Sequence, residues 1–246
     1  MKIKNLVLLS TLCLLFACGD GSNPTSQEIS SEAPISSEAP ISSEAEVQSD
    51  FDFFRSAITF ETNDAYTGYS LSESIMHKSS KEEISYKNTL VRIDNVSGAL
   101  EYTSSHEHIN TDINSDGEKI TETTHMYYTN GSIIIQGDDG RYTEKDGIIT
   151  KSSGLPKINP KEEHFTSLEL NKVGNTLDME GVIDPSKANE LFSATGLENI
   201  SNCTMEASLY DDRLEEVIWT YDQEEINVYV KLTIYYNDFV ITPPAL

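Results

Sequence analysis

The amino-acid sequence predicts an α+β fold that is mostly β, in which one or two helices cover a mostly antiparallel sheet. Apolar and polar residues alternate between residues 100 and 143, as they do in strands with one buried and one solvated face. Three turn-forming dipeptides, Asp116-Gly117, Asn130-Gly131 and Asp139-Gly140, separate these alternating runs. The clearest helix start is at Asp184-Pro185, where aspartate can cap the helix and proline can fill its first position.

A secretion signal precedes the predicted fold. Lys2 and Lys4 form a short basic start, and the apolar run Leu6–Phe16 follows it. This run is too short to span a bilayer, which takes about 20 residues. Its end, Leu15-Phe16-Ala17-Cys18, resembles the bacterial lipoprotein signal, in which the cysteine thiol is joined to diacylglycerol and the chain is cut before it. The resemblance implies that Cys18 is the lipid anchor and mature N-terminus. The alternatives are an ordinary signal peptide with a chance cysteine and a first structural helix.

A polar stretch separates the anchor from the domain. It runs from Gly19 to about Asp50, is rich in Ser, Glu, Pro and Ala, and repeats Ile-Ser-Ser-Glu-Ala at positions 29, 35 and 41. Such a composition buries too little apolar area to offset its ordering entropy. We therefore expect a disordered tether that holds the domain about 30 Å from the anchor. The predicted organisation is a signal peptide at 1–17, a lipid-anchored tether at 18–50 and a single β-rich domain at 51–246.

The acidic composition excludes a nucleic-acid binder. Without residues 1–17 the chain carries 15 basic and 41 acidic residues, so its net charge is −26. Binding to a phosphate backbone or broadly to anionic lipid headgroups requires clustered positive charge. A strongly acidic surface instead keeps an exported domain soluble and attracts cations.

Cys203 is the one cysteine left after Cys13 departs with the signal and Cys18 carries lipid, so no intramolecular disulfide is available. It falls on the apolar side of its predicted strand, which indicates a buried core thiol rather than a nucleophile. On the next strand, Trp219 is expected to face away from Leu214 and Ile218.

The remaining elements follow in chain order. Residues 51–58 are predicted as a short helix, with a first strand as the alternative. The helix that starts at Asp184 has an apolar stripe at Ala188, Leu191 and Phe192 and is expected to stop by Gly196. The other expected strands, which lack helical spacing, are residues 66–77, 83–94, 165–170, 176–183, 203–209, 214–218 and 226–234.

Turn positions predict the faces of the central hairpins. A two-residue turn at Asp116-Gly117 would place Ile109 opposite Thr124, and the next hairpin would place Met126 opposite Ile135. On this register the apolar face collects Ile109, Ile113, Ile120, Met126, Tyr128, Ile133, Ile135 and Tyr142. The polar face collects His106, His108, Asn110, Asp112, Lys119, Thr121, Thr123 and His125.

The order of the elements, with the meander that contains Met126-Tyr127-Tyr128-Thr129-Asn130-Gly131, resembles the LolA/LppX-like lipoproteins of bacterial envelopes. The resemblance covers most of residues 50–246 and includes the signal, the polar tether, the early and late helices and the closing strands. It implies a curved half-barrel sheet around an apolar cavity that helices partly plug. It also implies a role in holding or carrying a lipid or other apolar ligand.

The candidate residues for contact with an apolar ligand are Ile109, Met126, Ile133, Ile135 and Tyr142. If no cavity exists, the same side chains form an ordinary closed core. The sequence contains no Gly-x-Ser-x-Gly, phosphate loop or His-Glu-x-x-His motif. We therefore expect neither an enzyme nor a bound cofactor, and we assign no catalytic residue.

The candidate metal ligands are His106, His108 and His125, because the expected register places His125 across from one of the other two on the same face. Three imidazoles so placed suit zinc or copper; the alternative is a solvated polar face that carries histidines. Asp112–Gly117 matches the first half of a calcium loop, but Thr123 stands at the twelfth position, where a bidentate glutamate belongs. We interpret this stretch as a hairpin turn.

The residues thus predict a non-enzymatic lipoprotein of the bacterial cell envelope, extracytoplasmic and attached to the membrane through Cys18. Its β-rich domain is expected to bind a lipid or other apolar ligand between sheet and helices. The alternative is a cell-surface interaction module that binds a protein, glycan or metal on its outer face. The ligand, the type of envelope and the oligomeric state stay open.

Overall fold

The computed structural model describes residues 49–58, 65–109, 118–152 and 154–246. Within these ranges, residues 50–246 form one compact unit. The Asp116-Gly117 turn, the half calcium loop and Ile113 lie outside the described residues, as do Cys18 and most of the expected tether.

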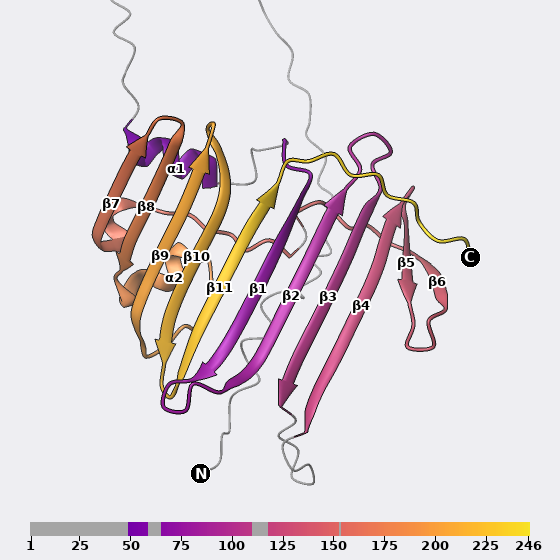
Figure 1. The fold of residues 1–246 in the computed structure, drawn as a ribbon, viewed down its shortest axis with the longest axis horizontal. Helices are drawn as coiled ribbons and strands as arrows, with labels where there is room; N and C mark the ends of the chain where they lie inside the picture. Colours follow the sequence, from indigo (N-terminus) through magenta and orange to yellow (C-terminus); the bar gives the residue numbers. More distant parts are fainter. Residues whose placement is uncertain (1–48, 59–64, 110–117, 153) are drawn as a thin grey trace, which may run out of the picture. The chain divides into compact units, whose positions relative to one another are not determined.

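One curved antiparallel sheet of eleven strands dominates the described fold (Figure 1). Its spatial order is β6-β5-β4-β3-β2-β1-β11-β10-β9-β8-β7. The strands are β1 (Gly68–His77), β2 (Glu83–Ile93), β3 (Leu100–Ile109), β4 (Lys119–Thr129), β5 (Ser132–Gln136), β6 (Tyr142–Asp146), β7 (Phe165–Val173), β8 (Thr176–Ile183), β9 (Ile200–Tyr210), β10 (Arg213–Gln223) and β11 (Ile226–Tyr235). Each strand pairs with the next one in sequence, except that β6 and β7 lie at opposite edges, and the last strand returns to pair with the first at the centre of the sheet. The sheet stays open, with β6 and β7 as its two edges, so the predicted mostly β fold with a curved antiparallel sheet is confirmed.

Two short α-helices accompany the sheet in the described ranges: α1 (Asp50–Ile58) and α2 (Ala188–Leu191). In α1 the residues Phe51, Phe54 and Ile58 recur at helical spacing, and all three are buried. The 3-10 turn η5 (Pro185–Lys187) leads into α2, and the Asp184 carboxylate caps this turn by accepting a hydrogen bond from the Ser186 backbone N–H at 2.9 Å. The predicted early helix and the predicted Asp184 cap are therefore both confirmed. A further 3-10 turn, η4 (Glu162–His164), precedes β7.

Both α-helices cover the same face of the β7–β10 half of the sheet and lie behind it in Figure 1. We call this face of the sheet the inner face and the opposite one the outer face. The Phe192 ring, directly after α2, packs on the inner-face ring of Trp219 with 5.4 Å between centroids. The Phe51 ring of α1 contacts the Phe165 ring of β7 at 6.5 Å.

Much of the core lies between the inner face and these helices, and the loop after β6 covers further inner-face residues, with Gly147 close to Ile133 and Gly154 close to Tyr69. In β11 the alternate residues Val228, Val230, Leu232 and Ile234 are all buried, whereas the residues between them are partly exposed. Phe54, Ile58, Leu191 and Met205 have no accessible surface, so side chains fill the space under the helices.

Among the predicted hairpin turns that the structure describes, Asn130-Gly131 is confirmed, whereas Asp139-Gly140 lies in a wider loop, because Gln136 pairs with Tyr142. Asn130 and Gly131 adopt φ values of +51° and +84°, the left-handed pair that a two-residue hairpin turn needs. Met126 accordingly pairs with Ile135, and Tyr128 pairs with Ile133, as predicted. Asp211 and Asp212 make the same kind of turn between β9 and β10, with φ values of +46° and +62°.

The expected register of the β3–β4 hairpin is wrong. Ile109 pairs with Lys119 rather than with Thr124, a shift of five residues. Because side chains alternate between faces with a period of two, an odd shift exchanges the two faces of one strand relative to its partner. This exchange changes which predicted site residues meet.

The expected orientation of Trp219 is right relative to Ile218 and wrong relative to Leu214. A bulge between Leu214 and Glu216 adds one residue to β10 opposite β9, which reverses the alternation beyond it. Trp219 therefore shares the inner face with Leu214, and Ile218 points to the outer face. Trp219 is buried at 7% exposure beneath Phe192.

Candidate functional site

The residues predicted to contact an apolar ligand divide between the two faces. Met126, Ile133 and Ile135 share the inner face, since Met126 pairs with Ile135 and Tyr128 pairs with Ile133. Tyr142 pairs with Gln136, and Ile109 pairs with Lys119, so both lie on the outer face. The expectation that all five share one face is therefore wrong, because the β3–β4 and β5–β6 registers differ from the assumed ones.

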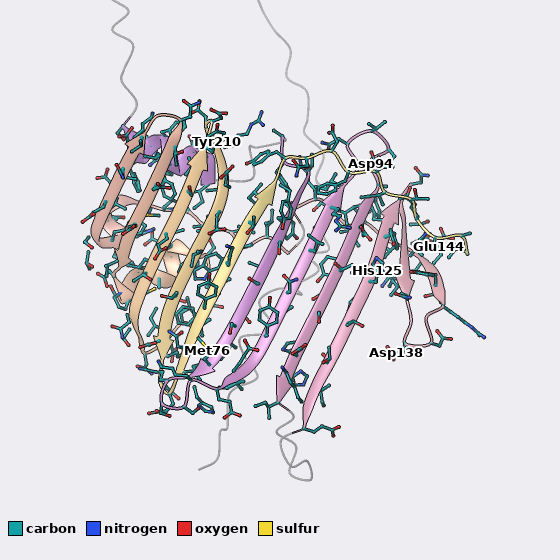
Figure 2. All side chains as sticks on the ribbon, viewed as in Figure 1. Met76, Asp94, His125, Asp138, Glu144 and Tyr210 are labelled. Carbon is teal, nitrogen blue, oxygen red and sulfur yellow. The ribbon has the colours of Figure 1, made fainter. Side chains whose placement is uncertain are left out.

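The three candidate histidines also separate. His106 and His108 point to the inner face, two residues apart on β3, with their rings stacked at 4.7 Å and 28°. His125 pairs with Thr103 and points to the outer face, where its Nε2 lies 3.0 Å from Glu101 Oε1. Figure 2 labels His125 on β4. The expected triad of imidazoles is therefore wrong.

Glu122, rather than His125, lies across from His106 on the inner face. It pairs with His106 across β3 and β4, and its Oε2 lies 3.9 Å from His106 Nδ1. Suitable ligand atoms of His106, His108 and Glu122 all lie within 4.8 Å of one another. The residue types were visible in the sequence, but only the correct register brings this carboxylate to the histidines.

Burial and nearby positive charge favour a neutral imidazole at His106. Its Nε2 lies 3.0 Å from Ser85 Oγ on the neighbouring strand β2. Burial lowers the pKa of His106, and the nearby His108 and Lys87 lower it further, whereas Glu122 acts in the opposite direction. His108 Nδ1 is shielded from solvent and has no hydrogen-bond partner among the described residues. Buried polar atoms without partners are uncommon in folded proteins.

A row of ionisable side chains crosses the inner face at this level. Glu73 on β1 pairs with Lys87 on β2, Lys87 pairs with His106, and His106 pairs with Glu122. Burial raises the pKa of Glu73, and the Lys87 charge partly opposes that shift. On the other side of Glu73 the ionisable row ends. The next paired residues are Val230 of β11 and Trp219 of β10, which belong to the core that the helices cover.

Apolar side chains occupy the same face nearer the start of β3. The half-buried residues there are Tyr102, Met126, Tyr128 and Ile135, beside the buried Val91, Leu100 and Ile133. Strands rise about 3.3 Å per residue, so this apolar region begins roughly 13 Å from His106 along the strands. The inner face of β1–β5 is thus polar at one end, apolar at the other, and partly exposed.

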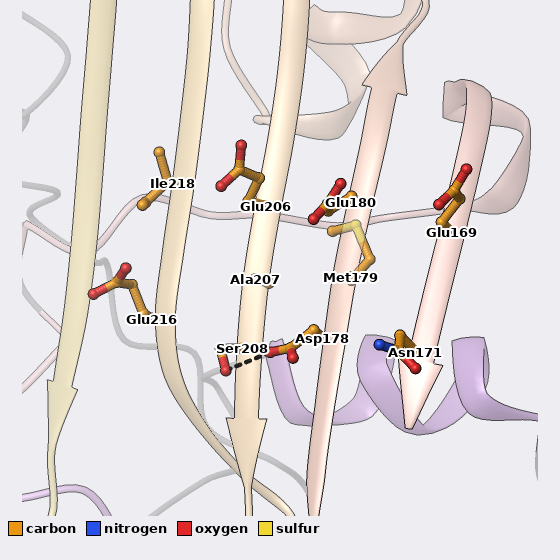
Figure 3. A pocket seen from close by; sticks show the side chains of 10 residues that line it. All are labelled: Glu169, Asn171, Asp178, Met179, Glu180, Glu206, Ala207, Ser208, Glu216 and Ile218. Carbon is orange, nitrogen blue, oxygen red and sulfur yellow. Dashed lines mark hydrogen bonds between the residues drawn. The ribbon is translucent and has the colours of Figure 1, made fainter. Parts of the chain in front are cut away.

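A pocket among the described residues lies elsewhere (Figure 3). This outer-face hollow of about 290 Å³ spans β7–β10, on the side of the sheet away from α1. Its lining includes the carboxylates of Glu169, Asp178, Glu180, Glu206 and Glu216. Ser208 donates a hydrogen bond to Asp178 at 2.8 Å across it. The hollow is acidic, so it is not the apolar cavity expected between sheet and helices.

A second histidine cluster joins η4 to α2. His164 is fully buried, and its Nδ1 accepts a hydrogen bond from the Lys161 backbone N–H at 3.3 Å. The Lys161 ammonium contacts the Glu190 carboxylate and lies 3.7 Å from that of Glu163. Because a protein cation already neutralises both carboxylates, we interpret this cluster as a structural link between two short elements.

The described residues define a protein built on an open antiparallel sheet that resembles a half-barrel. Helices cover one region of its inner face, and the other region is partly exposed. No protein-family model and no curated protein sequence matches this chain. In the described ranges, no helix combines the length and apolar character needed to cross a bilayer.

Proposed function

We propose that this protein is an extracytoplasmic lipoprotein, anchored through Cys18, that binds a lipid or other amphipathic molecule on the exposed inner face of β1–β5. One observation carries the proposal. Beyond the region that the helices cover, the inner face keeps apolar side chains half-exposed at one end and charged ones at the other. Half-exposed apolar residues grouped on one sheet face are typical of ligand-binding surfaces.

The proposed binding surface differs from the expected one. The space between the sheet and the helices is filled by side chains such as Phe54 and Leu191, which leaves the ligand the open part of the face. Met126 and Ile135 stay in the proposed surface, joined by Tyr102 and Tyr128, whereas Ile133 on the same face is buried against Gly147. Ile109 and Tyr142 leave it because they point to the outer face.

The polar row would orient such a ligand. Lys87 lies between Glu73 and His106 on the inner face, where it offers a donor to the head group of an amphipathic molecule. The apolar part would then lie along Tyr102 and Met126. In this arrangement the protein acts as a binding or carrier protein, and the anchor keeps it beside the membrane that supplies the ligand.

Native mass spectrometry of residues 19–246 tests the proposal, because this chain lacks only the signal and the lipid-bearing residue. Gentle purification from a bacterial host should yield a lipid-sized adduct that survives desalting. Met126→Asp places a charge on the apolar inner surface and should remove the adduct. Thr123→Asp, on the exposed outer face of the same strand, should keep it.

A bare mass for the unmodified chain, together with failure to take up added fatty acid or phospholipid, would overturn the proposal. Equal retention of the adduct in Met126→Asp and Thr123→Asp would also contradict it, since the ligand would then be bound elsewhere.

A further inference from the structure

We propose that His106, His108 and Glu122 bind a divalent transition-metal ion of the zinc class on the inner face of the sheet. Two imidazole nitrogens and one carboxylate oxygen are a common ligand set for such ions, with a fourth position left for water or another ligand. This inference does not rest on the proposed lipid binding, because the metal site needs no apolar ligand.

The strand geometry brings the three ligands together. His106 and His108 occupy alternate positions on β3, and Glu122 lies directly across from His106 on β4. Zinc bonds of about 2.0–2.1 Å in a tetrahedron separate the ligand atoms by roughly 3.3 Å. The His106–Glu122 pair, at 3.9 Å, is already close to this separation, and all three ligand atoms lie within 4.8 Å. Small side-chain rotations would complete the site.

A second polar contact selects the ligating atom of His106. Ser85 Oγ engages Nε2, which leaves Nδ1 directed at Glu122. Metal-binding histidines commonly have their other ring nitrogen hydrogen-bonded in this way, which holds the ring orientation and the tautomer.

His108 adds an independent observation. Its Nδ1 is buried and has no hydrogen-bond partner in the described part of the chain, although burial of an unpaired nitrogen is costly. Glu122, by contrast, has a side chain that is 69% exposed, so it can move onto an ion without disturbing the packing. The site thus combines a fixed pair of imidazoles with a movable carboxylate.

The charges around the site distinguish it from the cluster at His164. There the Lys161 ammonium already contacts both carboxylates, so a metal ion would have to displace it. Beside His106, Lys87 of β2 is a neighbouring cation on the inner face, and it also pairs with Glu73 across β1 and β2. Lys87 therefore weakens metal binding at this site without occupying it.

The test is zinc titration by calorimetry of residues 19–246, without a histidine tag. A large excess of calcium occupies the many surface carboxylates, which bind hard cations, and leaves the imidazole site free. We expect one zinc ion per chain. His106→Gln and Glu122→Gln should each weaken binding at least about tenfold, and Ser85→Ala should weaken it by about tenfold. Lys87→Gln should strengthen it.

Controls make the result specific. His125→Gln removes an imidazole from the outer face of β4 and should leave the affinity unchanged. Cobalt substitution should give a visible absorption spectrum that Glu122→Gln alters, and circular dichroism should show that each variant is folded. Absence of saturable zinc binding in calcium would overturn the proposal. Equal loss of affinity in His125→Gln and His106→Gln would overturn it as well.

Discussion

Asp222 is expected to stabilise the fold through its charge, because it joins three strands and a turn at one end of the sheet. It lies near the end of β10 and is 8% exposed. Its carboxylate accepts hydrogen bonds from Asn202 Nδ2 on β9 at 2.8 Å and from Asn227 Nδ2 on β11 at 2.9 Å. Lys78, just after β1, places its Nζ at 3.2 Å.

The change to test is Asp222→Asn, which keeps the shape of the side chain and removes its charge. One of the two oxygens becomes an NH₂ group that faces an amide donor, so at least one charge-assisted hydrogen bond is lost. Such bonds contribute about 1.5–3 kcal/mol each, and the half-exposed Lys78 adds little because water screens it. We expect the free energy of unfolding at pH 7 to fall by about 2–3 kcal/mol.

The pH dependence identifies the charge as the cause. The hydrogen bonds from Asn227 and then from Asn202 lower the pKa of Asp222 in the folded state. A carboxylate with a lowered folded-state pKa contributes stability that is present above its unfolded pKa, about 3.9. That contribution disappears as the pH falls through the folded-state pKa, so the difference between the two proteins should shrink below about pH 4.

Urea unfolding, followed by circular dichroism at pH 7 and at successively lower pH, measures the difference. Glu180→Gln serves as the control, because Glu180 is exposed on β8 and its loss should change stability by less than about 0.5 kcal/mol. A difference below 0.5 kcal/mol for Asp222→Asn at pH 7 would refute the reasoning. So would a difference that stays constant down to pH 3.

Two further predictions concern the buried inner face. Leu232→Ala on the central strand β11 removes a side chain with no accessible surface, so it should lower the free energy of unfolding by about 2–5 kcal/mol. Thr233→Ala, on the outer face of the same strand, should lower it much less. Similar urea midpoints for the two variants would contradict the assigned faces. The Cys203 thiol is buried, and burial raises its pKa to about 12. A thiol reagent at pH 8 should therefore modify Cys203 only after the protein unfolds. Rapid labelling of the native protein would contradict the burial of Cys203 in β9.

Short-range features of this protein were predictable because they depend on a few adjacent residues. Asn130-Gly131 forms the expected turn, since these two residues tolerate left-handed φ values at little cost. Asp184 caps the expected helical turn because its short carboxylate reaches the Ser186 N–H. Alternating apolar residues produced strands, and Cys203 is buried as its place in that alternation indicated.

The composition of the candidate site was only partly predictable. His106 and His108 were expected to meet, because two residues apart on a strand they must share a face. The residue of β4 that joins the two histidines was not predictable. Glu122 and His125 lie on opposite faces of β4, and the register of β3 and β4 decides which of them shares the face of His106 and His108. Met126 and Ile135 met as expected, since the short turn between them leaves one register.

The sequence by itself determined the mostly β class, the tight turns and the alternation within each strand, because these follow from local backbone preferences and side-chain spacing. The tertiary structure decided the pairing of Ile109 with Lys119, the bulge before Glu216 and the coverage of one half of the inner face. Each depends on contacts between residues distant in the chain. A single-residue change in register or a single inserted residue moves every later side chain to the other face, and local sequence preference does not select between the two outcomes.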